Sequence, residues 1–239
     1  MFNVEICNIS VSSGKNKKNI LNNCFFNLHP GKKYILFGRN GSGKTTLSLA
    51  LTNLLDENIF SVEGKVFFEG RDILQCSGDE MRNIIRKKIK YVFQDPVNCF
   101  DPLKKFKYYF SLSSFPKEKV EKELDFFLLP AFDELALKYP HEVSVGMAQR
   151  IALALSFAAE PNLIIMDEPN SALDLASSNL LAARCDEFSE AGSSILIITQ
   201  DFAFARRIGG ETAKIDSQSL VPFIPTETFF NNYMEKECR

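Results

Sequence analysis

The sequence predicts one α/β domain with a parallel-rich sheet, an N-terminal antiparallel β portion and an inserted helical lobe. Three observations carry this prediction. Two continuous apolar runs, Leu163–Met166 and Ser194–Thr199, have the length and composition of central strands covered on both faces. A strand-like run, Lys33–Phe37, leads through a glycine-rich loop into an apolar-faced helix expected over Thr45–Leu55. The segment 95–160 then changes to a proline-punctuated, helical character, which indicates a lobe inserted into the sheet.

The other strands are assigned in chain order. Residues Phe2–Phe26 alternate well enough to predict strands, which we expect to be interrupted by a polar turn at Ser12–Lys18. A second strand pair is expected at Gly64–Phe68 and Ile89–Phe93.

Two further helices complete the expected domain. Apolar residues recur at helical spacing over Lys117–Leu129, after a Ser-Phe-Pro start. Leu175–Ala191, between the two central strands, has the length and polarity of a surface helix. We therefore expect residues 1–239 to form one domain, in which 1–94 and 161–239 make the core and 95–160 the lobe.

Composition excludes several classes of protein. The chain has 239 residues, of which 45% are hydrophobic and 24% charged, as in ordinary globular domains. Lys and Arg number 28 against 30 Asp and Glu, so no basic field favours a nucleic-acid partner. No apolar run approaches the ~20 residues of a membrane span, and the amino terminus lacks a signal-peptide layout. The scattered cysteines are best explained as buried thiols in a reducing cytosol; they are Cys7, Cys24, Cys76, Cys99, Cys185 and Cys238.

The glycine-rich stretch Gly38–Thr45, GRNGSGKT, fits the pattern G-x-x-x-x-G-K-[ST] that wraps nucleotide phosphates. Glycines permit backbone conformations in which successive N–H groups point at anionic oxygens. We expect Lys44 to reach the β- and γ-phosphates and the Thr45 hydroxyl to ligate Mg²⁺. An ordinary glycine turn, the alternative, would not call for this Lys and Thr. The expected nucleotide contacts are Gly38, Arg39, Asn40, Gly41, Ser42, Gly43, Lys44, Thr45 and Thr46.

Two adjacent carboxylates, Asp167 and Glu168, follow the apolar run Leu163–Met166. They come at the carboxyl end of a predicted strand, where α/β sheets place ligands. Because neighbouring carboxylates repel each other, we expect a cation nearby. Asp167 would hold the shell of Mg²⁺, usually through water, and Glu168 would orient or deprotonate the attacking water. The alternative is a solvated Asp-Glu turn, which is common in isolation and less so behind a phosphate loop.

Three more segments have recognisable patterns: Tyr91–Pro96 (YVFQDP), Glu142–Arg150 (EVSVGMAQR) and Ser171–Asp174 (SALD). They resemble the Q-loop, the signature (usually Leu-Ser-Gly-Gly-Gln) and the D-loop of ATP-binding cassette (ABC) ATPases. The resemblance covers nearly the whole chain, and its five motifs stand in the family's order. The chain is therefore identified as a member of that family, which implies a P-loop NTPase core.

Two details resemble one subgroup, the oligopeptide, dipeptide and nickel importer ATPases. Gln94–Pro102 (QDPVNCFDP) is similar to the group's Gln-Asp-Pro-x-x-x-Leu-Asn-Pro run, and Met147 stands where the group often has Met. The alternative is chance similarity among cassette ATPases in general. The group's frequent His-Pro-Tyr-Thr motif is absent from Thr226–Arg239, which counts against peptides as the cargo.

The resemblance implies that two such domains pair head to tail and hold each ATP between one P-loop and the opposite signature. The other partners it implies are two membrane permease subunits and, indirectly, a solute-binding protein. The location it implies is cytoplasmic, at the inner face of the membrane. The implied catalytic residues are Glu168, Gln94 and Gln200, the Mg²⁺ ligands are Thr45, Gln94 and Asp167, and the contacts to the partner's nucleotide are Ser144 and Gly146.

The resemblance also suggests how the lobe couples to the membrane. Gln94 would lie at the hinge of the lobe and sense the γ-phosphate. The face near Val97–Phe106 is the candidate groove for a membrane subunit. Aromatic residues in that stretch could equally belong to the core of the lobe, and the composition slightly favours the core.

The sequence departs from the family pattern in three places. Gln200 stands at the usual position of the switch His, and Gln can donate an amide N–H but cannot become a cation, so we expect slower hydrolysis. Val145 replaces the first signature glycine, and the region of Ser13 lacks the aromatic that commonly stacks on adenine. These changes are either harmless drift or marks of a partly degenerate subunit in a heterodimer. The retained Glu168 favours an active ATPase.

Three functions compete at this stage. The leading hypothesis is the energising ATPase subunit of an importer for nickel, another metal complex or short peptides. The second is a subunit that binds ATP with little turnover. The third, a soluble cassette ATPase acting on ribosomes or DNA, usually needs two cassettes or a long coiled-coil insertion, which 239 residues without basic bias do not accommodate.

Overall fold

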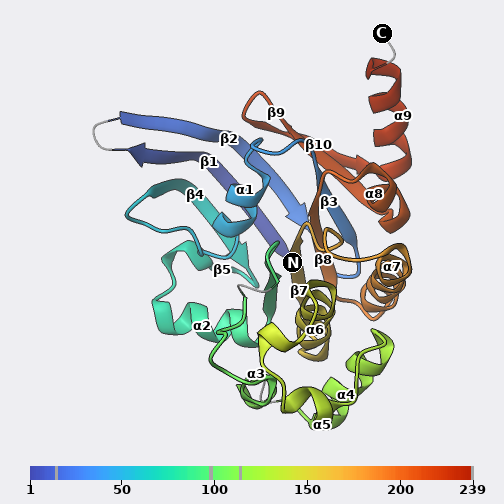
Figure 1. Cartoon of the computed structure of the whole chain (residues 1–239). Coiled ribbons are helices and arrows are strands. Elements are labelled where there is room, and N and C mark those ends of the chain that lie inside the picture. The colour runs from blue at the N-terminus through green and yellow to red at the C-terminus, as the bar shows by residue number, and fades with distance from the viewer. Residues whose placement is uncertain (14–15, 97–98, 113–114, 238–239) are drawn as a thin grey trace.

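One mixed sheet organises the computed structural model, which describes residues 1–13, 16–96, 99–112 and 115–237. In these residues ten strands follow the order β5-β4-β1-β2-β10-β9-β3-β8-β7-β6 (Figure 1). The strands are β1 (Phe2–Ser13), β2 (Asn16–Leu28), β3 (Lys33–Phe37), β4 (Phe60–Phe68), β5 (Arg71–Asp72), β6 (Ile89–Val92), β7 (Leu163–Asp167), β8 (Ser194–Thr199), β9 (Glu211–Asp216) and β10 (Ser219–Pro225).

The parallel half of the sheet confirms the predicted core. Strands β9, β3, β8, β7 and β6 pair in parallel, and every residue of β7 and β8 is buried. Alternate residues serve opposite faces: Ile164 and Met166 join one hydrophobic cluster, while Leu163 and Ile165 join the other. Because both faces are covered, these strands read as continuous apolar runs.

The antiparallel half is formed by β1, β2, β4 and β5 and corrects two expectations. The strands continue through most of the expected turn Ser12–Lys18, since Ser12 pairs with Lys17; residues 14–15 lie outside the described part. The expected pairing of Gly64–Phe68 with Ile89–Phe93 is wrong: β4 pairs with β1 and β5, and β6 pairs with β7 at the far edge. Strand-like patterns show that a segment is extended, but not which neighbour it meets.

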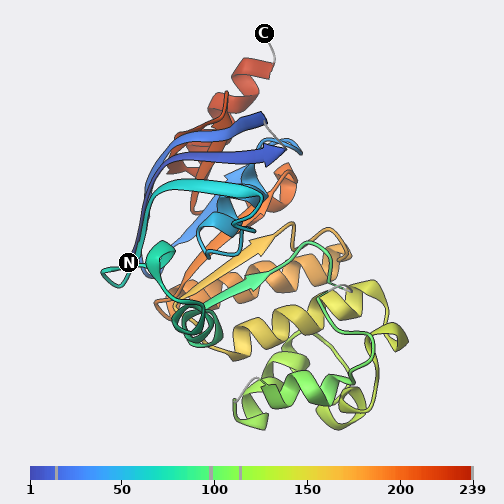
Figure 2. The same cartoon turned by 90° about the vertical axis from the view of Figure 1, so that its left-hand side faces the viewer.

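Helices cover both faces of the sheet and extend beyond one end of it. Figure 2 shows the helices of residues 106–158 at one end of the molecule and α9 at the other. The helices are α1 (Lys44–Ala50), α2 (Gly78–Lys87), α3 (Phe106–Leu112), α4 (Lys117–Phe126), α5 (Phe132–Ala136), α6 (Val145–Ala158), α7 (Leu175–Glu190), α8 (Phe202–Ile208) and α9 (Thr226–Glu237), with 3₁₀ turns η1 (Ile73–Gln75) and η2 (Pro140–Glu142). In the described residues, no helix is both long and apolar enough to cross a membrane.

The helix after the glycine loop is shorter than expected and ends at Ala50 rather than Leu55. Past this point the N–H groups of Thr52 and Asn53 bond three residues back instead of four. Asn53 then takes a left-handed conformation with φ of 50°, which ends the helix. Helix α1 buries Leu47 in the same cluster as the inner side chains of β1, β2 and β4, so it packs between the two halves of the sheet.

Residues 95–160 are helical wherever they form regular structure in the described part, as the sequence predicts. Phe100 and Phe106 are buried, which favours the core interpretation of these aromatics over an exposed groove; Val97 lies outside the described residues. One hydrophobic cluster runs from these helices into the strands, including Phe106 and Met166. The boundaries of the lobe therefore stay a prediction.

The thiols only partly follow expectation. Cys24 and Cys185 are buried, but Cys7 and Cys99 are exposed and Cys76 is half-buried. The expectation of buried thiols was wrong for the exposed pair, because scattered positions in a sequence do not reveal which face of an element a side chain occupies. Cys238 lies outside the described residues.

A buried ion pair joins α4 to α7. The Glu123 carboxylate accepts hydrogen bonds of 2.9 and 2.6 Å from Nε and Nη2 of Arg184. Glu123 is 4% exposed, and the guanidinium lies 5.3 Å from the ring centre of Phe157. The pair therefore fixes a lobe helix to a core helix in a site with little solvent.

We predict that Glu123→Ala lowers the free energy of unfolding by about 3 kcal/mol, because it leaves a largely buried guanidinium whose one remaining ionic partner among the described residues is Glu187. Urea denaturation measures this change. Lys119→Ala, which removes the exposed Lys119–Glu160 pair, is the control and should cost less than about 1 kcal/mol. Equal losses for the two variants would contradict a stabilising role for the buried pair.

Candidate functional site

The glycine loop connects the carboxyl end of β3 to α1, where the sequence places it. Gly43 has a φ of +100°, and a Cβ there would lie 3.0 Å from Cδ2 of Leu21. The left-handed conformation therefore favours glycine at this position, and the nearby Leu21 side chain leaves little room for a Cβ. The loop begins against the end of β8, because the Gly38 N–H bonds to the Thr199 carbonyl at 3.3 Å.

The Lys44 side chain folds back onto the start of the glycine loop. Its Nζ donates to the carbonyl oxygens of Gly38 and Arg39 at 2.7 and 2.8 Å, and the residue is only 5% exposed. Burial lowers the pKa of Lys44, and the charges of Glu168 and Asp167 oppose that shift. A desolvated ammonium held by neutral carbonyls is well placed to exchange them for anionic oxygens.

Asp167 is 2% exposed at the end of β7. Its Oδ2 accepts a hydrogen bond of 2.6 Å from the Thr45 hydroxyl. Its Oδ1 is buried without a hydrogen bond of standard geometry in the described residues, although the Tyr91 hydroxyl stabilises the carboxylate. Burial raises the pKa of Asp167, and Thr45 and Lys44 partly offset this. A carboxylate oxygen left over beside a hydroxyl fits the oxygen ligands that Mg²⁺ prefers.

Glu168 is held from two sides. Its Oε2 accepts from the Thr199 hydroxyl and its Oε1 from the Gln200 backbone N–H, both at 3.1 Å. The residue is 7% exposed and has a φ of 45°, a left-handed conformation that is uncommon for a non-glycine residue. Burial raises the pKa of Glu168, while the Thr199 hydroxyl acts in the opposite direction.

These groups face one cavity of about 510 Å³, a volume typical of small-ligand sites. Its phosphate-loop wall continues into the two carboxylates and Gln94, and its far wall comes from the β1–β2 and β9–β10 regions. The lining residues are Val11, Lys18, Asn19, Ile20, Asn40, Gly41, Ser42, Gly43, Lys44, Thr45, Thr46, Gln94, Asp167, Glu168, Ile215, Ser217 and Gln218. In this described set no side chain is aromatic, and the far wall combines aliphatic side chains with polar ones.

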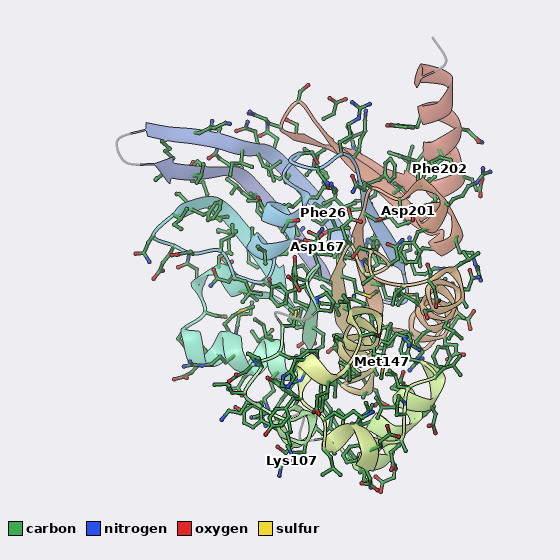
Figure 3. The ribbon with its side chains drawn as sticks, viewed as in Figure 1. Phe26, Lys107, Met147, Asp167, Asp201 and Phe202 are labelled. Carbon is green, nitrogen blue, oxygen red and sulfur yellow. The ribbon has the colours of Figure 1, made fainter. Side chains whose placement is uncertain are left out.

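Most of the predicted site residues meet at this cavity, but five of them do not line it. Gly38 and Arg39 lie behind Lys44 and contribute carbonyl oxygens. Gln200 is exposed and contacts Glu168 through its backbone. Ser144 and Gly146 lie at the start of α6, near Met147 in Figure 3 and apart from Asp167. Their predicted contacts to a partner's nucleotide therefore stay predictions.

The start of α6 touches the segment after the carboxylates. Ser144 caps the helix by accepting a hydrogen bond from the Met147 N–H at 3.2 Å. A Cβ on Gly146 would lie 2.9 Å from the Ala172 carbonyl oxygen, so only glycine permits this approach. The two segments that resemble the signature and the D-loop are thus in direct contact.

Sequence reasoning missed one polar network. The Asp201 N–H donates to the Thr199 hydroxyl at 3.0 Å, and Asn170 Nδ2 donates to Asp201 Oδ2 at 2.9 Å. The carboxylate of Asp201 also caps α8 (Figure 3 labels Asp201). Thr199 directly precedes Gln200 at the end of a predicted strand, so its position could have been found from the sequence. Its hydrogen bond to Glu168 could not be predicted from the sequence, because it depends on the pairing of β7 with β8.

We predict that Glu168→Gln stabilises the nucleotide-free protein near neutral pH. A raised folded-state pKa means that the folded protein binds this proton more readily than the unfolded chain. The contribution of Glu168 to stability is thus present below the ordinary glutamate pKa and is lost as the pH rises through the raised value. Thermal unfolding across pH should give the variant a higher midpoint temperature than the parent near neutral pH, and the difference should narrow on acidification. A lower midpoint for the variant near neutral pH would contradict the view that burying the charged carboxylate destabilises the protein.

Comparisons with known proteins agree with this geometry. A family model described as ABC transporter matches residues 21–171. The oligopeptide transport ATP-binding protein OppD of Bacillus subtilis is 31% identical over 82% of this chain and 58% of its own length. OppF of Streptococcus pyogenes serotype M1, with the same description, is 31% identical over 96% of this chain and 77% of its own. The chain thus spans a little over half of the first relative.

Solved structures show the same fold. The ATP-binding cassette MJ0796, in a dimeric post-hydrolysis state bound to ADP and Pi, superposes with a TM-score of 0.82 at 22% identity. The match covers 95% of this chain and 99% of the other. The predicted α/β fold with its P-loop NTPase core is thereby confirmed.

Proposed function

Because the chain belongs to the ABC transporter family of ATPases, we propose that it is the subunit whose ATP hydrolysis energises a membrane importer of short peptides. The observation that carries the proposal is the union of phosphate loop and carboxylates in one cavity. Thr45 and Asp167, 122 positions apart in sequence, are joined there by a hydrogen bond of 2.6 Å. A buried carboxylate oxygen of Asp167 that has no hydrogen bond of standard geometry in the described residues, a buried lysine and a fixed glutamate complete the set that triphosphate hydrolysis requires.

The roles of the residues follow from their positions. The backbone N–H groups of Asn40–Thr46 would bind the phosphates, and Lys44 would exchange its two carbonyl partners for phosphate oxygens. Thr45, Gln94 and Asp167 would hold Mg²⁺, which when bound neutralises phosphate charge. Glu168 would accept a proton from the attacking water, since its carboxylate has lone pairs beyond the two that Thr199 and Gln200 use.

The proposal includes a second ATPase subunit, identical or different. Ser144 is exposed at the start of α6, where it could reach a nucleotide held by that subunit. We further propose two permease subunits bound through the helices of residues 95–160, a solute-binding protein acting indirectly, and a cytoplasmic position at the inner face of the membrane.

Short peptides are the cargo that the relatives favour. The relatives include proteins named as oligopeptide or dipeptide transport ATP-binding proteins, and one named as a glycine betaine transport ATP-binding protein. None of these names mentions nickel, the other cargo expected from the sequence. Glu168 and both of its hydrogen-bond donors are in place, which supports turnover over a role limited to ATP binding.

Two measurements test the proposal. The purified full chain should release phosphate from Mg·ATP, and the complex isolated with its membrane partners should take up labelled di- to hexapeptides into vesicles when ATP is present. Uptake of Ni²⁺ without uptake of peptides would overturn the assignment of short peptides as the cargo. Absence of phosphate release from both preparations would overturn the proposal that the chain hydrolyses ATP.

A further inference from the structure

The end of β8 connects the two halves of the hydrolytic site. The Thr199 carbonyl accepts from the Gly38 N–H at the start of the phosphate loop, and the Thr199 hydroxyl donates to Glu168 Oε2. One residue earlier, the Ile198 carbonyl accepts from the Glu168 N–H at 2.8 Å. Backbone and side chain of Glu168 are thus both fixed by consecutive residues of β8.

The Gln200 side chain takes no part in this arrangement. Gln200 is exposed, and only its backbone N–H reaches Glu168, at 3.1 Å. Any residue except proline would supply that donor. A carboxylate oriented in this way does not need an imidazole at position 200.

We propose that Thr199 is the positioning residue of this site: its hydroxyl, with the Gln200 backbone N–H, orients the Glu168 carboxylate toward water. The proposal rests on the proposed function, since it assumes that Glu168 activates the attacking water. It accounts for a Gln at position 200 in a chain that retains the carboxylate.

The geometry fixes the direction in which the Thr199 hydroxyl donates its proton. Thr199 is completely buried, and its hydroxyl donates to Glu168 while accepting the Asp201 N–H at 3.0 Å. The direction of its proton is thereby set toward the carboxylate, because the Asp201 N–H can only donate. Two donors on different carboxylate oxygens hold the plane of the group, whereas one would let it rotate.

The test compares four single variants of the full chain by steady-state hydrolysis of Mg·ATP. Thr199→Val keeps the shape and removes the hydroxyl, so kcat should fall roughly 10- to 100-fold with KM unchanged, as when a catalytic group is slightly misplaced. Thr199→Ser restores the hydroxyl and should recover most of the rate. Gln200→Ala keeps the backbone donor and should lower kcat less than Thr199→Val.

Thr212→Val is the matched control. Thr212 is also completely buried in a strand of the same sheet, and its hydroxyl lies 2.9 Å from the Thr226 hydroxyl, outside the cavity. This variant loses a buried hydroxyl without touching Glu168, so its kcat should equal that of the parent. Thermal unfolding of each variant reports whether it is folded.

A double variant separates the inference from the proposed function. In a Glu168→Gln background, Thr199→Val should cause no further loss of kcat, since its effect passes through Glu168. If Glu168→Gln alone leaves hydrolysis intact, or the parent shows none, the proposed function fails. If Glu168→Gln is inactive but Thr199→Val behaves like Thr212→Val, or Thr199→Ser recovers nothing, only the role of Thr199 is overturned.

Discussion

Replacing Glu168 with glutamine is expected to lower kcat for ATP hydrolysis by about 10²- to 10⁴-fold, the range for loss of a positioned acid–base group. Glutamine fills the same space and can still accept the Gln200 N–H, but it cannot take a proton from water. ATP binding should persist because the phosphate loop is untouched. Phosphate release and equilibrium binding of labelled ATP measure the two effects.

The same variant should accumulate as an ATP-bound dimer, which gel filtration with and without ATP detects. Glu187→Gln is the control, because Glu187 is exposed and pairs with Arg184 away from the cavity. If Glu168→Gln retained turnover near the parent rate, the proton acceptor would have to be another group.

Removal of Lys44 is expected to have the second large effect. Lys44→Ala should weaken ATP binding about 10- to 100-fold, since a hydrogen bond to a charged group contributes about 1.5–3 kcal/mol. Hydrolysis should become undetectable, because the developing charge on the phosphate would lose the positive charge of Lys44. Isothermal titration with ATP and phosphate release measure the two losses.

Lys90 provides a matched control for Lys44. Its Nζ also donates to a backbone carbonyl, that of Arg86 at 2.8 Å, and burial lowers its pKa as well. It lies in β6 and does not line the cavity. Lys90→Ala should therefore bind ATP like the parent. Equal losses of affinity in the two variants would show that the effect comes from general destabilisation.

Local patterns were sufficient for the elements of the core. The strand Lys33–Phe37 was predicted with its correct bounds, and Ser194–Thr199 likewise. The glycine loop between strand and helix and the carboxylates at a strand end were also predictable, because their chemistry depends on neighbours in the sequence. The end of α1 at Ala50 was not predicted, since it depends on the left-handed conformation of Asn53.

Pairings between distant segments were outside the reach of the sequence. Nothing local places β4 beside β1 rather than β6, because an extended segment offers the same backbone hydrogen bonds to any neighbour. The orientation of Glu168 by Thr199 follows from the parallel pairing of β7 with β8.

The sequence by itself determined which groups we propose for nucleotide binding and hydrolysis: Lys44, Thr45, Asp167 and Glu168 stand in motifs whose residue types and spacing are set along the chain. The tertiary structure alone decided how those groups are held, including the burial of Asp167 beside Thr45 and the two hydrogen bonds that hold Glu168. The physical reason is the distance along the sequence over which each kind of interaction acts. Backbone conformation is governed by residues a few positions apart, whereas burial and hydrogen-bond partners arise only when packing brings distant strands together.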